Sequence, residues 1–360
     1  MLPVLGKGGA ERQFLNYTSY GDSVHEHCVF SWNKGPYDEI LLKNGIKVFL
    51  VKNKNPLSII IHYLKTLHEI KPDIIQSWLP QTDVFCGLLN FLGKHKVIAS
   101  ERSSEKLYIS IDGVREKWYT KLRPFVLKHF ITGLITNSPS GLEYIQKITN
   151  NNLKVKMIEN GIIENNPITL KDPFFNKLEM NFTIITVSRL VKYKRIDLII
   201  SAIRTLIDMK KSVKLIIVGS GSYENNLKNF AQNIGLTESV IFYGYSDNVP
   251  SLLLGADVFC TASEIEGLPN ALLEAMSLGI PVLASNIDSH NYVMEDAAIY
   301  FNLGDKNDLV EKILLLINDK ELRERLKYIS KKRLEKFSLS NMVKKFDNFY
   351  EDILLSYENS

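Results

Sequence analysis

The stretch EGLPNALLEAMSLGIPVLAS, residues 266–285, decides the fold of the second half of the chain. Pro269 suits the first position of a helix, because the N–H group that proline lacks would have no partner there. Gly279 and Pro281 then supply the stop. The apolar run PVLAS that follows is typical of a buried strand. The stretch therefore predicts a helix that leads directly into a strand.

Two carboxylates flank the start of this helix. Glu266 stands just before it, and Glu274 lies about 7 Å along the axis at 1.5 Å per residue. Carboxylates accept paired hydrogen bonds from vicinal hydroxyls, so this spacing matches a ligand with a sugar at each end of a diphosphate. The alternative is that both carboxylates are only solvated. Leu272, Leu273 and Met276 surround Glu274 and favour an enclosed helix instead.

The helix start itself is a candidate binding element. Its free N–H groups and its dipole favour an anion or sugar oxygens. The residues that would present these groups are Gly267, Leu268, Pro269 and Asn270.

Short β-branched runs alternate with longer amphipathic segments along the chain, which is typical of parallel sheets with crossover helices. The first series lies at residues 46–51, 73–78, 96–100, 134–138 and 154–158, and a second series of six runs follows a polar stretch at residues 160–181. The pattern predicts an α/β protein of two Rossmann-like doubly wound domains, residues 1–165 and 166–340, that face an interdomain cleft. We expect a helix at about 341–360 to pack back on the first domain. Residues 1–4 leave that domain a first strand that is short or missing.

Composition excludes several classes of protein. The chain has 360 residues, 45% of them hydrophobic, and a net charge of +4, with 21 Lys and Arg against 15 Asp and Glu in residues 1–165. This basic half suggests contact with anionic surfaces or phosphate-bearing substrates, but the excess is too small for a dedicated nucleic-acid binder. The three cysteines form no disulfide or zinc pattern. With no apolar run of about 20 residues and no signal peptide, we expect a cytoplasmic location.

A second cluster of candidate residues is the turn in VSRLVKYKRIDLII. Arg189 and Lys194 lie between the end of a strand and the start of a helix. Cations at that place are well positioned for phosphate oxygens, Arg through its planar fork and Lys as a point charge. The alternative is ordinary surface charge.

Glycines mark two further loops. Gly6, Gly8 and Gly9 precede a helix, and Gly219 and Gly221 follow a strand. Adjacent glycines let a backbone approach a phosphate closely, although a plain tight turn explains them nearly as well. Neither loop has the full dinucleotide fingerprint, so a dehydrogenase is disfavoured.

Taken together, these motifs resemble glycosyltransferase family 4, the retaining enzymes of the GT-B fold. The resemblance rests on EGLPNALLEAM, SRLVKYKR, GKGGAER, IENGI and VGSGSYENNL, and it runs through nearly the whole chain. It implies a GT-B fold and a nucleotide-sugar donor, UDP-linked, as substrate, with no cofactor.

The resemblance also implies roles for the candidate residues. Arg189 and Lys194 would hold the donor diphosphate, Glu274 the ribose hydroxyls, and Glu266 would face the donor sugar. Gly9 would approach the diphosphate from the other domain. The base would lie near Gly219 and Gly221 and near a second group of residues, Tyr243, Gly244 and Tyr245.

One position departs from the family pattern. Many relatives carry a histidine after the strand that matches KVIAS, whereas this chain reads ASERSS and places Arg102 there. Glu101, Arg102 and Ser103 are therefore candidates for the acceptor side. Alternatively, they only cap the segment that follows.

The expected mechanism is electrostatic. When the glycosidic bond to the diphosphate breaks, the leaving group gains negative charge, which Arg189, Lys194 and helix N–H groups would stabilise without a metal. The absence of an Asp-x-Asp sequence agrees with a metal-free site. The resemblance implies that anomeric configuration is retained, with Glu266 as a positioning group.

Residues 113–130, GVREKWYTKLRPFVLKHF, mix basic and aromatic side chains. Such a mixture suits a membrane surface, although a solvated basic helix is equally consistent. With the family resemblance, it predicts a glycan or lipid-linked acceptor and peripheral contact of the N-terminal domain with the inner face of the cytoplasmic membrane. The product would be a surface polysaccharide or lipid-linked oligosaccharide. A GT-B sugar-nucleotide epimerase and a non-catalytic nucleotide-binding protein of the same fold are the alternatives.

Overall fold

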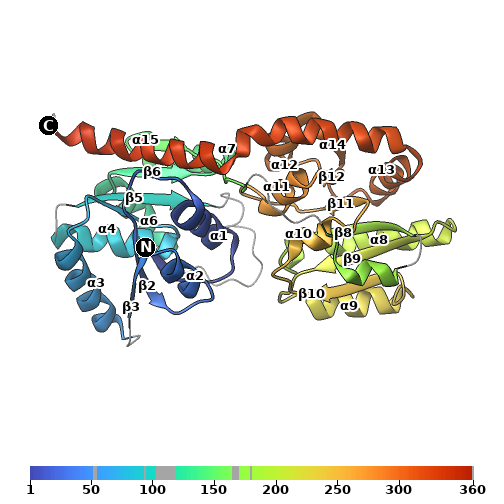
Figure 1. Ribbon diagram of the computed structural model, residues 1–360, viewed down its shortest axis with the longest axis horizontal. Helices are drawn as coiled ribbons and strands as arrows, with labels where there is room; N and C mark the ends of the chain where they lie inside the picture. Colours follow the sequence, from blue (N-terminus) through green and yellow to red (C-terminus); the bar gives the residue numbers. More distant parts are fainter. Residues whose placement is uncertain (52–54, 93–94, 103–117, 164–169, 179–180, 359–360) are drawn as a thin grey trace. The chain divides into compact units, whose positions relative to one another are not determined.

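The computed structural model describes residues 1–51, 55–92, 95–102, 118–163, 170–178 and 181–358. The chain forms two compact units, one made of Met1–Ile163 and Phe337–Ser360 and the other of Glu164–Lys336 (Figure 1). We call them unit 1 and unit 2. The candidate residues Ser103 and, in the basic segment, 113–117 lie outside the described residues.

Unit 1 is built on two groups of parallel strands that meet at Met1. The first has the order β1-β2-β3 and the second β4-β5-β6-β7. The amino group of Met1 donates to the carbonyl of Gln76 at 2.5 Å, and the N–H of Trp78 donates to the carbonyl of Met1 at 3.3 Å. This is the hydrogen-bond pattern of a parallel pair with Met1 opposite Ser77, so the two groups form one continuous layer. The strands are β1 (Leu2–Val4), β2 (Cys28–Asn33), β3 (Lys47–Leu50), β4 (Ile74–Gln76), β5 (Lys96–Glu101), β6 (Gly133–Thr136) and β7 (Lys154–Met157).

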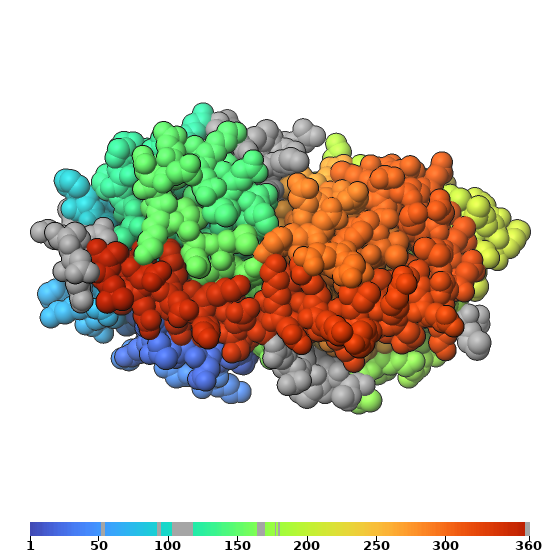
Figure 2. All heavy atoms as spheres, turned by 90° about the horizontal axis from the view of Figure 1, so that it is seen from above, coloured from blue at the N-terminus to red at the C-terminus, as the bar shows by residue number. Residues whose placement is uncertain are grey.

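Helices cover both faces of this layer. The described helices of unit 1 are α1 (Gly9–Leu15), α2 (Asp38–Lys43), α3 (Pro56–Ile70), α4 (Pro80–Leu89), α6 (Trp118–His129), α7 (Pro139–Thr149) and α15 (Leu339–Glu358). On one face, α15 buries Phe346, Phe349 and Ile353 in a core that it shares with α1 and β1. Figure 2 shows α15 as a red band between segments from the early and middle parts of unit 1. On the other face, α3, α4 and α6 enclose a second core.

Unit 2 contains a six-stranded parallel sheet in the order β10-β9-β8-β11-β12-β13. The order reverses between β8 and β11, as in a doubly wound sheet. Its strands are β8 (Phe182–Val187), β9 (Val213–Val218), β10 (Val240–Gly244), β11 (Val258–Thr261), β12 (Val282–Ser285) and β13 (Ala298–Phe301). Its described α-helices are α8 (Ile196–Asp208), α9 (Glu224–Asn233), α10 (Val249–Leu253), α11 (Asn270–Ser277), α12 (Asp288–Met294), α13 (Lys306–Asn318) and α14 (Lys320–Leu334).

The predicted α/β class with Rossmann-like parallel sheets is confirmed. One strand was not predicted: β2 has a single β-branched residue, Val29, so it lacks the pattern on which the first series of strands rests. Within the described ranges, no helix combines the length with the low charge that crossing a bilayer requires.

Two glycines of unit 2 are required by a close approach between chain segments. A Cβ at Gly219 would stand 1.9 Å from the carbonyl oxygen of Ser188, and one at Gly221 would stand 2.3 Å from that of Leu190. The backbone of this turn runs against the segment after β8, with the N–H of Leu190 donating to the carbonyl of Ser220 at 3.0 Å. Close packing onto the Arg189 turn therefore explains why glycine occupies both positions.

We predict that Gly219→Ala destabilises the protein by about 3 kcal/mol or more, because the added methyl meets backbone and φ is +131°. Gly304→Ala is the matched control: its φ is +82°, but nothing lies within 4 Å of the new Cβ, so only about 1 kcal/mol is expected. Urea denaturation of the two variants measures the difference. Equal losses would contradict the packing argument.

Candidate functional site in unit 2

The candidate site is built on the segment that joins β11 to α11. The helix begins at Asn270, one residue later than expected, so Pro269 is the residue that caps it with extended backbone (φ −77°, ψ 111°). At the other end Gly279, with φ +65°, donates to the carbonyl of Met276 at 3.1 Å, and Ile280 donates to that of Ala275 at 3.0 Å. This is a Schellman ending, which fixes where the helix stops.

Glu266 and Lys194 form an ion pair in front of this helix. Both side chains are largely buried, with exposed fractions of 14% and 13%. The same oxygen of Glu266 accepts a hydrogen bond from the hydroxyl of Ser263 at 2.8 Å. β8 and β11 are adjacent parallel strands, so the loops that follow their carboxyl ends bring the two residues together.

The turn that carries Lys194 is tied to the same segment by two further contacts. The carbonyl of Tyr193 accepts from the N–H of Glu264 at 2.9 Å, and the guanidinium of Arg195 lies 2.7 Å from the Glu264 carboxylate. Arg195 has a φ of +49°, which turns the chain from the short 3₁₀ helix at Lys192–Lys194 into α8. The position of Lys194 therefore depends on these neighbours as well as on Glu266.

His290 is connected to the ion pair through Ser285 and Ser263. It is fully buried, and its Nδ1 lies 2.9 Å from the carbonyl oxygen of Ser285. The hydroxyl of Ser285 donates to the carbonyl of Ser263 at 2.7 Å, which continues the chain of contacts to Glu266. His290 was not among the candidate residues, because nothing in its local sequence indicates that it lies near the charge of Glu266, 24 positions earlier.

Burial and charge act in opposite directions on the ionisable groups of the site. Burial alone would raise the pKa of Glu266, but Lys194 and the Ser263 hydroxyl outweigh it and hold that pKa below the usual 4.5. Burial lowers the pKa of His290 to about 4, although the Glu266 charge opposes this shift. At neutral pH the site thus holds a charged carboxylate and a neutral imidazole.

Arg189 is placed differently from Lys194. Its side chain is exposed, and its guanidinium donates to the hydroxyl of Tyr193 at 2.9 Å. The structure therefore brings Lys194, but not Arg189, into contact with Glu266.

The remaining candidates of unit 2 lie on α11 and around the ends of β9 and β10. Glu274 is on α11 with only 7% of its surface exposed. Tyr243 donates through its hydroxyl to Asp172 at 3.4 Å, and Tyr245 is half exposed, with its hydroxyl 2.8 Å from Asp247. Between them Gly244 has φ +85°, with open space where a Cβ would be. Its carbonyl accepts from Gly219 at 2.8 Å, which joins the two glycine-bearing turns.

Three described candidates belong to unit 1. Gly9 is the first residue of α1. Glu101 is fully buried and pairs with Arg123 of α6 at 2.5 Å, so contact with an acceptor would require this pair to open. The guanidinium of Arg102 stacks on Trp78 at 4.4 Å from the ring centre.

The described residues contain no group of three or more His, Cys, Asp or Glu placed to hold a metal ion. Metal independence stays a prediction.

Comparison with known proteins finds a match for most of unit 2. Residues 169–333, which include Lys194, Glu266 and Glu274, match the family model described as glycosyl transferases group 1. These residues are similar to the group 1 glycosyltransferases.

Two curated relatives extend the similarity beyond residues 169–333. The UDP-Gal:alpha-D-GlcNAc-diphosphoundecaprenol alpha-1,3-galactosyltransferase of Escherichia coli is 27% identical over 57% of this chain, and the chain spans only 56% of its length. The capsular polysaccharide biosynthesis glycosyltransferase CapM of Staphylococcus aureus is 26% identical over 89% of this chain and 86% of its own.

A solved structure supports the fold of both units. HepE from Anabaena, in complex with UDP and glucose, has a TM-score of 0.83 over 98% of this chain and 99% of its own, at 19% identity. At this identity the likeness shows the fold alone. The GT-B fold predicted from the sequence, with two Rossmann-like domains, is confirmed.

We predict that His290 makes the stability of unit 2 sensitive to acid. Burial lowers the pKa of His290 to about 4 in the folded protein. In the unfolded chain the same imidazole takes up a proton near pH 6.5, so protonation between these two pH values favours unfolding. The stability contribution is complete above pH 6.5 and is lost as the pH falls towards 4, by about 3 kcal/mol. Urea titrations at several pH values should show this loss in the native protein and not in His290→Gln. Parallel pH profiles would contradict the prediction.

Proposed function

We propose that this protein is a glycosyltransferase that moves a sugar from a nucleotide-sugar donor to a glycan acceptor, as a member of the retaining family 4. The observation that carries the proposal is the largely buried pair of Lys194 and Glu266 at the start of α11, inside the part of the chain that matches the family model. A cation, a carboxylate and the N–H groups of a helix start there would provide what a sugar diphosphate requires.

The donor diphosphate would bind between Lys194 and the start of α11. An ammonium group has three N–H donors, so Lys194 can hold Glu266 and a phosphate oxygen at the same time. The exposed guanidinium of Arg189 is free of carboxylate contacts among the described residues, and rotation about its side chain would bring it to the phosphate. These charges would stabilise the nucleotide diphosphate as it leaves, without a metal ion.

Glu266 would position the donor sugar through its second oxygen, since Lys194 and Ser263 both bind the first. Retention of configuration would follow from attack of the acceptor hydroxyl on the face that the diphosphate leaves. Glu274 would bind the ribose hydroxyls. The base would lie near Gly219, Gly221 and Tyr245.

The names of similar proteins support the substrate classes. The Escherichia coli relative is named for a UDP-linked galactose and a diphosphoundecaprenol acceptor, CapM for capsular polysaccharide, and HepE was solved with UDP. We propose a UDP-linked hexose or N-acetylhexosamine as donor and a lipid-linked glycan as acceptor, in surface polysaccharide or oligosaccharide assembly.

The exposed face of α6 supports contact between unit 1 and a membrane. Trp118 is 68% exposed and Phe125 is 52% exposed, and the exposed Lys121 and Lys128 lie on the same face of the helix. Exposed aromatic and basic side chains together suit a lipid headgroup surface. Arg123 does not contribute to this face, because it is buried against Asp83 and Glu101.

Incubation with a panel of UDP-, GDP- and ADP-sugars, with and without lipid extract, tests the proposed activity. Release of nucleotide that depends on the extract supports a transferase. Interconversion of the sugar would instead indicate an epimerase, and binding without turnover a non-catalytic protein.

We predict that Lys194→Ala and Glu274→Ala each weaken UDP binding by about tenfold or more, because each removes a charge-assisted hydrogen bond. Glu266→Gln should lower kcat by about a hundredfold and change UDP affinity less than these two variants do, since glutamine keeps an oxygen for Lys194 while the charge that would face the sugar is lost. Calorimetry and single-turnover kinetics measure the two effects. Lys192→Ala, an exposed neighbour in the same turn, is the matched control. Unchanged UDP affinity in both of the first two variants would refute the assigned roles.

A further inference from the structure

Arg102 of unit 1 is a cation whose hydrogen-bonding capacity is largely unused. The residue as a whole is partly exposed, but its Nε and Nη2 atoms are buried and have no hydrogen-bond partner. Its Nη1 atom makes one long contact, 3.5 Å from the Oδ1 of Asn160. Burial lowers the pKa of the guanidinium to about 10, so the group stays charged at neutral pH. Charged N–H groups that are withdrawn from water without an acceptor cost free energy, so this arrangement favours binding of an anion.

The surroundings of Arg102 are aromatic. Its guanidinium lies 4.4 Å from the ring centre of Trp78 and 5.7 Å from that of Phe346. The rings attract the charge but offer no hydrogen-bond acceptor in their plane. Successive residues at the end of a strand point to opposite sides, and the carboxylate of Glu101 pairs with Arg123 on the other side of the layer. Within the described part of the chain, no carboxylate forms an ion pair with Arg102.

Asn137 adds an unpartnered acceptor to the same place. It follows β6 as Arg102 follows β5, and the two strands are adjacent and parallel. The Nδ2 group of Asn137 donates to the Oδ1 of Asn160 at 3.1 Å, whereas its own Oδ1 is buried and has no partner. We call Arg102, Asn137 and Asn160 the polar cluster. At the carboxyl edge of the sheet it offers N–H donors of a cation and one neutral acceptor.

Contacts with α1 and α15 fix the segment that carries Asn160. The N–H of Gly161 donates to the Oε1 of Gln13 in α1 at 2.9 Å. On the other side of Asn160, the carboxylate of Glu159 accepts from Lys345 in α15 at 2.7 Å. The oxygen that both Arg102 and Asn137 contact is therefore held by the fold, so a ligand would meet a largely preformed site.

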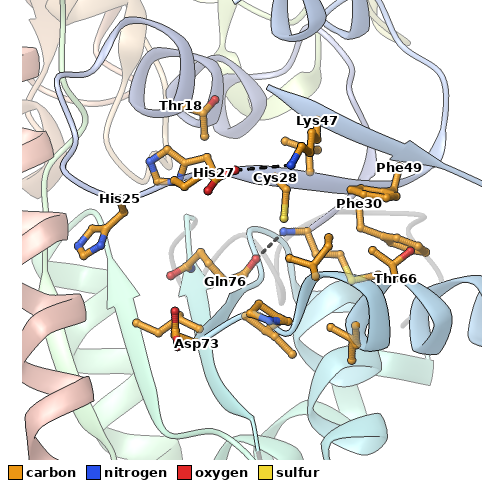
Figure 3. A pocket seen from close by; sticks show the side chains of 18 of the residues that line it. Thr18, His25, His27, Cys28, Phe30, Lys47, Phe49, Thr66, Asp73 and Gln76 are labelled. Atoms are coloured by element: carbon orange, nitrogen blue, oxygen red, sulfur yellow. Dashed lines mark hydrogen bonds and ion pairs between the residues drawn. The ribbon is translucent and has the colours of Figure 1, made fainter. Parts of the chain in front are cut away.

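The polar cluster is separate from the cavity of unit 1. That cavity has a volume of about 540 Å³ and lies at the amino ends of β2, β3 and β4, where Figure 3 shows His27, Cys28 and Gln76 around it. None of the three cluster residues lines it. The cluster lies at the opposite ends of the parallel strands.

We propose that the polar cluster binds the diphosphate of a lipid-linked acceptor, with Arg102 on a phosphate oxygen and the Oδ1 of Asn137 accepting from a hydroxyl of the attached sugar. A guanidinium presents a planar fork that matches two phosphate oxygens. An amide oxygen without a donor suits a hydroxyl. A sugar joined to a lipid by a diphosphate has both groups side by side. The identity of this ligand rests on the proposed function, whereas the site itself rests on the contacts described above.

Two features favour the acceptor over the donor as the source of this diphosphate. Under the proposed function, Lys194 and the start of α11 in unit 2 already provide for the donor diphosphate. The polar cluster belongs to unit 1, which also carries the exposed aromatic and basic face of α6 that suits a lipid surface.

The test uses the full chain and measures binding by calorimetry in the absence of any sugar donor. The lipid-linked probe is glucosyl geranyl diphosphate, and the comparison ligands are inorganic diphosphate and UDP. Arg102→Met removes the charge and keeps most of the side-chain length, whereas Arg102→Lys keeps a charge without the fork. Asn137→Leu removes the unpartnered acceptor. Arg123→Met is the matched control for stability, because Arg123 is a buried arginine that is paired with Asp83 and Glu101.

We predict that Arg102→Met weakens binding of the lipid-linked probe by about tenfold or more and leaves UDP affinity within about twofold. Arg102→Lys should recover part of the loss. Asn137→Leu should weaken binding of the lipid-linked probe by about fivefold and that of inorganic diphosphate little. Because Arg102 is buried without a carboxylate, Arg102→Met should also raise Tm by about 2–4 °C, whereas Arg123→Met should lower it.

A measurement on the native protein does not depend on how the variants fold. The Nε–H resonance of Arg102, identified by its absence from the spectrum of Arg102→Lys, should shift when the lipid-linked probe is added. A resonance that does not shift, or an unchanged affinity of Arg102→Met for the probe, would overturn the proposal. A fall in Tm with retained affinity would show that the role of Arg102 is only structural.

The comparison ligands test the source of the phosphate. If Arg102→Met weakened UDP binding as much as probe binding, Arg102 would belong to the donor site. Tighter binding of inorganic diphosphate than of the probe would indicate a site for a free anion. Either result rejects the acceptor assignment. Because the assay contains no donor, sugar transfer without probe binding at Arg102 contradicts this inference alone, and probe binding without sugar transfer contradicts the proposed function alone.

Discussion

The candidate site depends on one constraint: a carboxylate and an amine that are both largely withdrawn from water must stay together. Glu266 and Lys194 come from loops after adjacent strands, and either charge alone would be poorly solvated at its position. The Glu264 contacts and the Ser263 hydroxyl position the two loops so that the pair can form. A nucleotide diphosphate entering this site would meet charges that the fold has already fixed, so little reorganisation would accompany binding.

Signals in the local sequence were sufficient to predict the helices and strands of unit 2. The proline and glycine that bound α11 were recognised because caps and stops depend on residues close in sequence, and helix geometry then related Glu266 to Glu274. The ion pair between Glu266 and Lys194 was not predicted, because a sequence pattern does not reveal where the side chains of an irregular turn point. His290 was missed, since its contact with the site runs through the side chain and backbone of Ser285.

Two features of unit 1, the burial of Arg123 and the strand β2, were not predicted because they too depend on contacts between residues far apart in the sequence. Arg123 was read as part of a basic surface, yet it is buried between Asp83 of α4 and Glu101 of β5. Ionic residues at the core of a domain cannot be distinguished by composition from those on its surface, because their burial depends on partners far along the chain. β2 was missed for a related reason: its burial comes from neighbouring strands and helices, while its own residues carry a weak strand pattern.

The path of the chain has a consequence for biosynthesis. Unit 1 is discontinuous, and α15 supplies Phe346, Phe349 and Ile353 to the core that contains Leu2 and Phe14. During translation those early residues must wait until almost the whole polypeptide has left the ribosome, whereas unit 2, being continuous, has all its residues sooner. We therefore expect unit 2 to complete its folding before unit 1, which reverses the usual order and leaves an apolar face of unit 1 uncovered while synthesis continues.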